Sequence, residues 1–256
     1  LPAVAEAVSA GRFFQLWKLV MLINADFSRP VILAPHQYRW VASPQGGVER
    51  IMLDRIGAEQ ARATSIVRYA PESFFPPHRH PGGEEILVLD GTFSEDGVDY
   101  PAGWYLRNPP GSSHRPSSGA GAVIFVKLQQ MQPREQRHVR IDTRDPANWR
   151  EQRGRAVCPL FDDAAEQVSL QRLMPHEALL AEAGGGQELL VLEGEVRARQ
   201  HACAPRSWMR LPAGTLPAIV AGAQGATVYL KVRHVADTTL KGSACNTHAS
   251  SLSAPA

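Results

Sequence analysis

Residues 82–91 read GGEEILVLDG, and this stretch decides the fold because it returns at residues 185–194 as GGQELLVLEG. A second segment recurs downstream in the same order, since VIFVKL at 123–128 returns as TVYLKV at 227–232. Matches that keep their order indicate a duplicated domain. The sequence therefore predicts two copies of one fold in a chain of 256 residues.

Each copy has the sequence pattern of a β domain. Short apolar or alternating runs, such as residues 64–70 and 86–89, are separated by turn residues about every eight to twelve positions. The chain holds 21 Gly and 20 Pro, which favours many turns over long helices. We expect an all-β fold of antiparallel sandwiches or barrels, with a turn at Asp90–Gly91.

Composition and charge exclude several classes of function. The net charge of +2 comes without any basic run interleaved with aromatic residues, which argues against nucleic-acid binding. No polybasic amphipathic helix points to a membrane surface. The three cysteines form no disulfide framework, which favours a reducing compartment. We therefore expect a cytoplasmic protein with no nucleic-acid or membrane partner.

The two ends of the chain differ from the rest. Residues 13–23 are apolar but too short to span a bilayer. Either Met21 is the natural start, or the preceding residues form an extra helix packed on the fold. The tail from residue 236 is rich in Ser, Thr and Ala, and we expect it to be disordered.

A group of His and Glu residues in the first copy has the pattern of a metal site. His78 and His80 are two apart, so on a strand both point to one face while Arg79 points to the other. Glu84 follows a Pro-Gly-Gly turn, and His114 follows a Pro-Pro-Gly turn further along the chain. Three imidazoles and one carboxylate suit Zn, Fe(II), Mn, Ni or Co, with coordination positions left open for water or a ligand.

The second copy serves as an internal control for this interpretation. A lone His in a strand is commonly a surface or core residue, so His78 and His80 alone are moderate evidence. In the second copy Ala181 and Ala183 replace these two histidines and Gln187 replaces Glu84, while the shorter loop has no counterpart of His114. Four unrelated residues would not vanish together, whereas the ligands of one ion would.

Other residues near these motifs have weaker signals. Phe74, Trp104 and Arg107 are candidates to line a substrate pocket, although aromatic residues of a small barrel are more often plain core. Arg107 has an equal alternative as a structural arginine paired with Asp or Glu. Glu85 points away from Glu84, so we expect it to be solvated or in an ion pair. No nucleophile elbow or phosphate loop is present, and the catalytic residues remain unassigned.

The metal-site motif resembles that of a known family. Residues 78–84, HRHPGGE, followed by Gly91, look like the first cupin motif. Gly103, Pro109 and His114 resemble the second, with a slightly longer gap between the proline and the histidine. The residues at 80–94 and 107–114 are closer to one branch, the cupin domain of ChrR-like anti-sigma proteins.

The resemblance implies a fold, a ligand set and a division of the chain. The implied fold is a bicupin, two tandem cupin barrels of the double-stranded β-helix or jelly-roll type. In that family the positions of His78, His80, Glu84 and His114 bind one divalent metal, often zinc. The predicted segments are an N-terminal extension (1–29), a metal-binding cupin (30–131), a linker (132–150), a degenerate metal-less cupin (151–235) and a disordered tail (236–256).

The resemblance leaves two main hypotheses for function. ChrR-type regulators carry a helical sigma-binding domain before the cupin, and residues 1–29 are too few for it, so the anti-sigma function does not carry over. Related cupins cleave β-diketones or hydroxyacetophenones with Fe(II) and O2, which favours a non-haem metal-dependent dioxygenase acting on a small carbonyl or diketone compound. The alternative is a metal- or ligand-binding sensor of oxidative stress without catalysis, and a third option is a purely structural metal.

Either function implies a small-molecule substrate or ligand. We also expect a homodimer, because an open sandwich has sheet edges and faces that pairing would cover.

Overall fold

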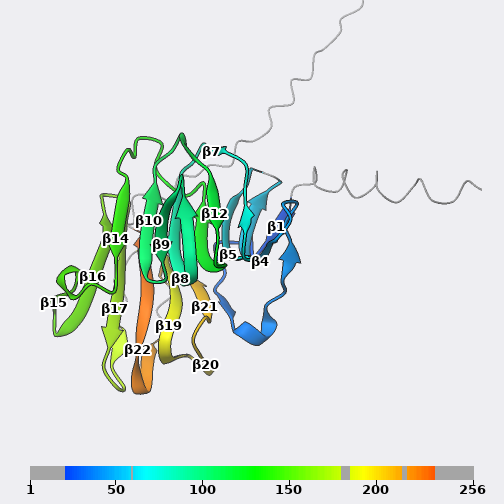
Figure 1. Ribbon diagram of the computed structural model, residues 1–256. Coiled ribbons are helices and arrows are strands. Elements are labelled where there is room, and N and C mark those ends of the chain that lie inside the picture. The colour runs from blue at the N-terminus through cyan, green and yellow to red at the C-terminus, as the bar shows by residue number, and fades with distance from the viewer. Residues whose placement is uncertain (1–20, 59, 180–184, 215–217, 234–256) are drawn as a thin grey trace, which may run out of the picture.

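The computed structural model describes residues 21–58, 60–179, 185–214 and 218–233. Nearly all regular structure in this part of the chain is β, so the all-β prediction is confirmed (Figure 1). The predictions for residues 1–20, for the tail from residue 236 and for Ala181 and Ala183 concern residues outside the described ranges. Among the described residues no helix is long and apolar enough to cross a membrane.

One large antiparallel sheet carries most of the first half, in the order β1-β4-β5-β13-β8-β10-β14. The strands β3, β6, β9 and β12 attach beside this path, and β7 pairs with β11 in a separate two-stranded sheet. The bounds are β1 (Met21–Ile23), β3 (Val41–Ala42), β4 (Val48–Gly57), β5 (Arg62–Tyr69), β6 (Ser73–Phe74), β7 (His78–His80), β8 (Glu84–Glu95), β9 (Val98–Pro101), β10 (Trp104–Asn108), β11 (Ser112–His114), β12 (Pro116–Ser118), β13 (Ala122–Leu128) and β14 (Val139–Asp142).

A second antiparallel sheet carries the other half, in the order β15-β16-β17-β22-β19-β21-β2, with β18 and β20 attached. Two short 3-10 helices, η2 and η3, lie in the connections. The bounds are β2 (Val31–Leu33), η2 (Pro35–Gln37), η3 (Pro146–Asn148), β15 (Arg150–Gln152), β16 (Arg155–Asp162), β17 (Glu166–Leu173), β18 (Ala178–Leu179), β19 (Gln187–Ala198), β20 (His201–Cys203), β21 (Trp208–Leu211) and β22 (Ile219–Arg233).

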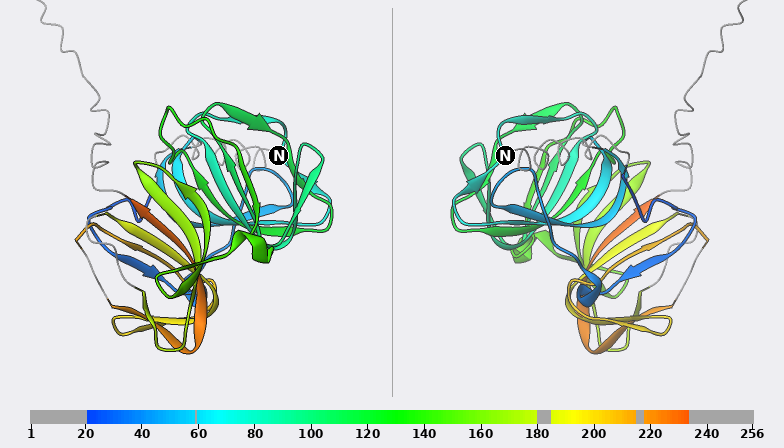
Figure 2. Two further views of the ribbon diagram at one scale, coloured as in Figure 1. Left: turned by 90° about the vertical axis from the view of Figure 1, so that its left-hand side faces the viewer. Right: turned by 90° about the vertical axis from the view of Figure 1, so that its right-hand side faces the viewer.

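The two halves share strands across the boundaries expected from the sequence. Strand β2 lies inside the segment assigned to the first cupin, yet it pairs with β21 of the second sheet (Figure 2). Strand β14 lies inside the segment assigned to the linker, yet it pairs with β10 of the first sheet. Each strand covers an edge that would otherwise expose unpaired backbone groups. The two halves are therefore joined by strand pairing as well as by the covalent connection between them.

Strand β8 bends where the sequence predicted a turn. It continues through Asp90–Gly91 to Glu95, so its first part pairs with β10 and β13 and its second part with β9 and β12. Gly91 has φ of 67°, and a Cβ there would lie 2.1 Å from the carbonyl oxygen of Gly121. Gly194 repeats this in the second half, with φ of 69°. At both positions glycine allows the backbone of the neighbouring strand to approach closely beside a β-bulge. Neither glycine forms a hairpin turn.

The two large sheets pack against each other through their outward faces (Figure 2). This shared core joins apolar residues of both halves, among them Leu87, Tyr105, Leu190 and Trp208. Phe125 and Tyr229, which occupy equivalent positions of the repeat, contact each other edge to face with ring centroids 5.3 Å apart. The contact between equivalent residues indicates that a pseudo-twofold axis relates the two halves.

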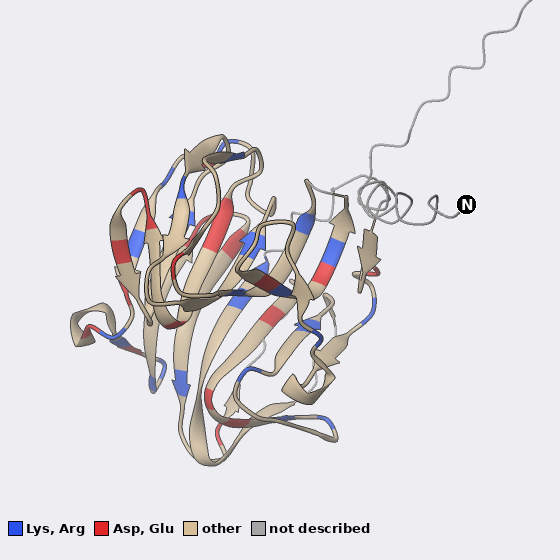
Figure 3. Cartoon of the chain, turned by 45° about the vertical axis from the view of Figure 1, so that its right-hand side comes forward, with Lys and Arg blue, Asp and Glu red and all other residues tan. Residues whose placement is uncertain are grey.

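Buried charges follow the same pseudo-symmetry. Lys127 of the first half forms an ion pair with Glu188 of the second, and Lys231 of the second pairs with Glu85 of the first at 2.8 Å. All four side chains are buried, and several charged bands lie within strands rather than loops (Figure 3). Burial alone would raise the pKa of Glu85, but the charges of Lys231 and Arg107 outweigh it and hold the pKa well below its ordinary value. These carboxylates are therefore ionised and bound to partners in the opposite half.

We predict that Lys127→Met destabilises the protein by about 3–5 kcal/mol, because Glu188 would remain buried without its cationic partner. The double variant Lys127→Met/Glu188→Leu should recover much of this loss, because no unpaired buried charge remains. Urea denaturation followed by circular dichroism measures both free energies of unfolding.

The matched control is Arg68→Met, which removes a cation from an exposed pair with Glu49. Its cost should be about 0–1 kcal/mol. An equally small loss for Lys127→Met would contradict the importance of the buried pairs.

Candidate metal centre

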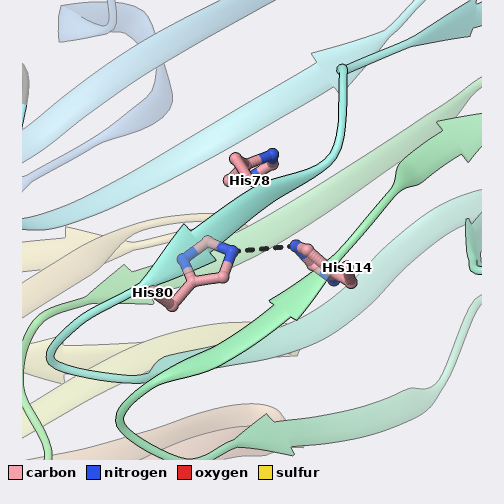
Figure 4. Close-up of side chains that lie close together, drawn as sticks. All are labelled: His78, His80 and His114. Atoms are coloured by element: carbon pink, nitrogen blue, oxygen red, sulfur yellow. Dashed lines mark hydrogen bonds between the residues drawn. The ribbon is translucent and has the colours of Figure 1, made fainter.

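Two short paired strands position the three histidines. In β7 and β11 the register places His114 directly opposite His78 and Ser112 opposite His80. Residues two apart on a strand share a face, so His78, His80 and His114 all point to the same side, while Arg79 is exposed as predicted. Figure 4 shows the three imidazoles facing one another from these two strands.

The ring nitrogens of the three histidines lie close together. The three histidines each offer a ring nitrogen, and these nitrogens lie within 4.8 Å of one another. The Nε2 atoms of His80 and His114 are 2.8 Å apart. Glu84 at the start of β8 places its Oε2 atom 3.3 Å from His114 Nε2 and 3.5 Å from His80 Nε2. The structure therefore brings the three predicted histidines to one place, and Glu84, the fourth predicted ligand, lies beside two of them.

The surroundings of His78 and His80 favour metal binding. His80 and His114 are buried, whereas His78 is partly exposed. Burial lowers the pKa of His80, which favours the neutral imidazole that a metal requires. The Nδ1 atom of His78 lies 2.8 Å from the carbonyl oxygen of Pro76. A hydrogen bond donated by Nδ1 leaves Nε2 of His78 available as the ligand.

A second carboxylate, Glu95 at the end of β8, orients His114. Its Oε1 atom is 2.9 Å from His114 Nδ1, the arrangement that fixes the tautomer of a metal-binding imidazole. Asn108 donates to the same carboxylate at 2.9 Å, and Arg140 forms an ion pair with it at 2.8 Å. Burial alone would raise the pKa of Glu95, but its contacts with His114 and Arg140 lower it. Glu95 is therefore held as an anion behind His114.

Sequence reasoning did not identify Glu95, Asn108 and Arg140 as part of the site. Comparison of the two copies along their paired strands singles out two of these residues, Glu95 and Asn108. The register of β19 and β21 aligns Ala198 with Glu95 and Leu211 with Asn108. The second copy thus has apolar residues in place of these two supporting polar residues. It also has Gln187 in place of the predicted ligand Glu84. Arg140 lies in the segment predicted to be a linker, where no sequence pattern relates it to Glu95.

The metal centre opens onto a cavity of about 600 Å³ inside the first half. His78, His80 and Glu84 contribute to its lining. Most of the lining residues are apolar. Strands β4, β5 and β13 contribute Val48, Val67, Tyr69, Ile124, Val126 and Leu128, and Phe75 lines the cavity from the segment after β6. A metal ion held by these ligands would therefore be accessible to a small molecule.

The three residues predicted to line a substrate pocket lie elsewhere. Phe74 is 44% exposed, and Arg115 stacks over its ring. Trp104 packs against Tyr100 at the other side of the core. Neither side chain contributes to the cavity, and the neighbouring Phe75 lines it instead. Phe74 is therefore wrong as a pocket residue, because adjacent residues of an extended chain point to opposite faces.

Arg107 has the structural role that was weighed as its alternative. It is 1% exposed and forms ion pairs with Glu85 at 3.2 Å and with Glu166 of the second half at 2.7 Å. Its guanidinium also stacks on Phe161. Arg107 therefore belongs to the contact between the halves, away from the cavity. Glu85 is fully within this contact too, which confirms the ion pair and not the solvated alternative.

The donor set fits a divalent transition metal better than a hard cation. Imidazole nitrogen suits Zn, Fe, Ni and Cu, whereas Ca and Mg prefer oxygen ligands only. Three His and one Glu leave further coordination positions free in a five- or six-coordinate ion. The residues present can therefore hold such an ion and still expose it to the cavity.

Comparison with known families identifies the first half. Residues 28–132 match the family described as the ChrR cupin-like domain, in agreement with the resemblance noted from the motifs. This match contains the four predicted ligands together with Glu95 and Asn108. Comparison with curated proteins gives no match.

Solved structures with the same fold cover most of the chain. A candidate dioxygenase from Nostoc punctiforme has a TM-score of 0.67 at 14% identity, covering 83% of this chain and 85% of its own. Protein Ylba from Escherichia coli has a TM-score of 0.63 at 14% identity, covering 88% and 98%. A bacterial pirin from Escherichia coli, in complex with nickel(II), has a TM-score of 0.59 at 12% identity, covering 80% and 98%. The chain therefore has the cupin fold, and its residues 28–132 match the ChrR cupin-like domain.

Proposed function

We propose that this chain is a metal-dependent cupin enzyme, such as a dioxygenase that acts on a small carbonyl or diketone compound. The observation that carries the proposal is the position of the ligands: His78, His80 and Glu84 line a cavity large enough for a small molecule. A purely structural ion is enclosed by its ligands, whereas a catalytic ion keeps an open position. The arrangement favours the catalytic type of site.

Each part of the site has a defined task in this proposal. A bound transition metal would supply a Lewis acid for a carbonyl group or a redox-active centre for O2 chemistry. Glu84 lowers the net charge of the ion, and Glu95 keeps His114 in the ligating tautomer. The apolar wall excludes water and strengthens the electrostatic interactions inside the cavity.

The identity of the metal is open among Zn, Fe(II), Mn and Ni. Two of the similar structures, a candidate dioxygenase and a nickel complex of a pirin, support a catalytic role and a transition metal. The homodimer and the cytoplasmic location stay predictions. Tight metal binding without any detectable reaction would favour the sensor hypothesis.

We expect the purified chain to bind one divalent metal ion, and the variant His78→Ala/His80→Ala to lose it, because two of the four ligands are removed. Elemental analysis by mass spectrometry measures the metal content. The control is His201→Ala, an exposed histidine of the second half, which should keep full metal content. Stoichiometric metal in the double variant would show that the ligands are assigned wrongly.

The variant Glu95→Gln should bind the metal about 10- to 100-fold more weakly, because the orienting carboxylate behind His114 loses its charge. Competition with a chromophoric chelator measures the dissociation constant. Glu193→Gln, which changes an exposed carboxylate on β19, is the matched control and should leave the affinity unchanged. Equal metal affinities for the two variants would contradict a role of Glu95 in metal binding.

The Fe(II)-loaded protein should consume O2 with at least one member of a panel of β-diketones and phenolic ketones. An oxygen electrode measures the uptake, and His78→Ala/His80→Ala with the same Fe(II) corrects for reaction of the free ion. Tightly held zinc together with no uptake under any metal would count against the oxygenase and favour the sensor.

A further inference from the structure

Two arginines of β4, Arg50 and Arg55, line the cavity beside the metal centre. Arg55 is only 4% exposed. Its Nη2 atom donates a hydrogen bond to the carbonyl oxygen of Ala58, but its buried Nε atom has no hydrogen-bond partner. Within the part of the chain that the structure describes, no carboxylate forms an ion pair with Arg55. A buried cation without a counter-ion is costly unless a ligand supplies the charge.

Strand register shows how Arg55 lies relative to the metal ligands. Arg55 pairs with Ala63, Ala63 with Leu128, and Leu128 with Glu84, on four neighbouring strands. Directly opposed residues of antiparallel strands share a face, so Arg55 and Glu84 both point to the interior. Three interstrand spacings of about 4.8 Å place them about 14 Å apart along the sheet, and closer across its concave side. A small molecule can therefore span from the metal to Arg55.

Arg50 and Arg55 place two cationic side chains at the same end of the cavity. Burial lowers the pKa of Arg50, and burial together with the charge of Arg50 lowers that of Arg55. The positive charge of Arg50 therefore lies close enough to Arg55 to disfavour the charged form of Arg55. An anion bound beside Arg55 would offset this effect.

The metal-less half has lost these arginines along with the ligands. The register of β16 with β17 aligns Val157 with Arg50 and Asp162 with Arg55. Val157 and Asp162 line the cavity of the second half, which measures about 240 Å³. A structural role in the sheet would have kept the arginines in both halves. Their presence only beside the metal centre indicates a role in the ligand site.

We propose that the cavity binds a small organic acid, with its carboxylate on Arg55 and Arg50 and its other end at the metal centre. The planar guanidinium of Arg55 matches a carboxylate through paired hydrogen bonds. The apolar wall between the two ends takes the carbon skeleton. This inference rests on the proposed function, because it requires the metal to bind one end of the substrate.

The test uses the full chain loaded with Co(II), whose visible spectrum reports both metal binding and changes in its coordination. The probes are methyl ketones with a terminal carboxylate, from levulinate upward in chain length, each compared with its methyl ester. We expect the acid to bind about 10- to 100-fold more tightly than its ester at the chain length that spans the cavity, as for one charge-assisted hydrogen-bond pair. Arg55→Met should abolish this preference without loss of Co(II).

Two further variants make the test independent of the fold. Arg50→Met should also reduce the preference, and Arg68→Met, an exposed arginine of β5 outside the cavity, should keep it at the same net charge as Arg55→Met. Absence of the Co(II) spectrum would overturn the metal site itself. A normal Co(II) spectrum with no acid bound, or with acid and ester bound equally, would overturn the carboxylate site alone.

Discussion

The buried contact between the two sheets is the constraint on which the position of the metal centre depends. Each large sheet uses its outward face for this contact, through a shared apolar core and the reciprocal pairs of Lys127 with Glu188 and of Lys231 with Glu85. Because residues alternate between faces, the inward face of the first sheet is left for the cavity and for Glu84. The neighbouring residues Glu84 and Glu85 therefore have different roles: Glu84 faces the histidines and the cavity, whereas Glu85 takes part in the contact between the halves.

The sequence predicts the parts of this structure that depend on local pattern. The repeat of residues 82–91 and the spacing of His78 and His80 were sufficient for the β fold and for the candidate ligands, because a strand alternates its faces with period two. Both signals lie within a few residues of each other in the chain. The prediction that His114 returns beside them also holds, since antiparallel pairing of β7 with β11 brings them together.

The parts that could not be predicted depend on contacts between distant residues. Arg107 carries a charge that suits a ligand site equally well, and only the packing of Glu166 and Phe161 against it reveals its structural role. Glu95 and Arg140 lie 45 positions apart, and their contact follows from the pairing of β10 with β14. Pattern alone also placed a turn at Gly91, where the strand in fact bends and continues, because Gly is compatible with both.

The contact of Phe125 with Tyr229 has a consequence for how such a molecule arises. In a symmetric pair of identical subunits, equivalent residues meet in this way at the rotation axis. Here both partners belong to one polypeptide, so their association is intramolecular and does not weaken on dilution. One half is then released from any need to retain a ligand site, and its interior can fill with residues such as Leu211 and Ala198. Covalent linkage thus lets one half keep the candidate ligands while the other half serves as a permanent packing partner.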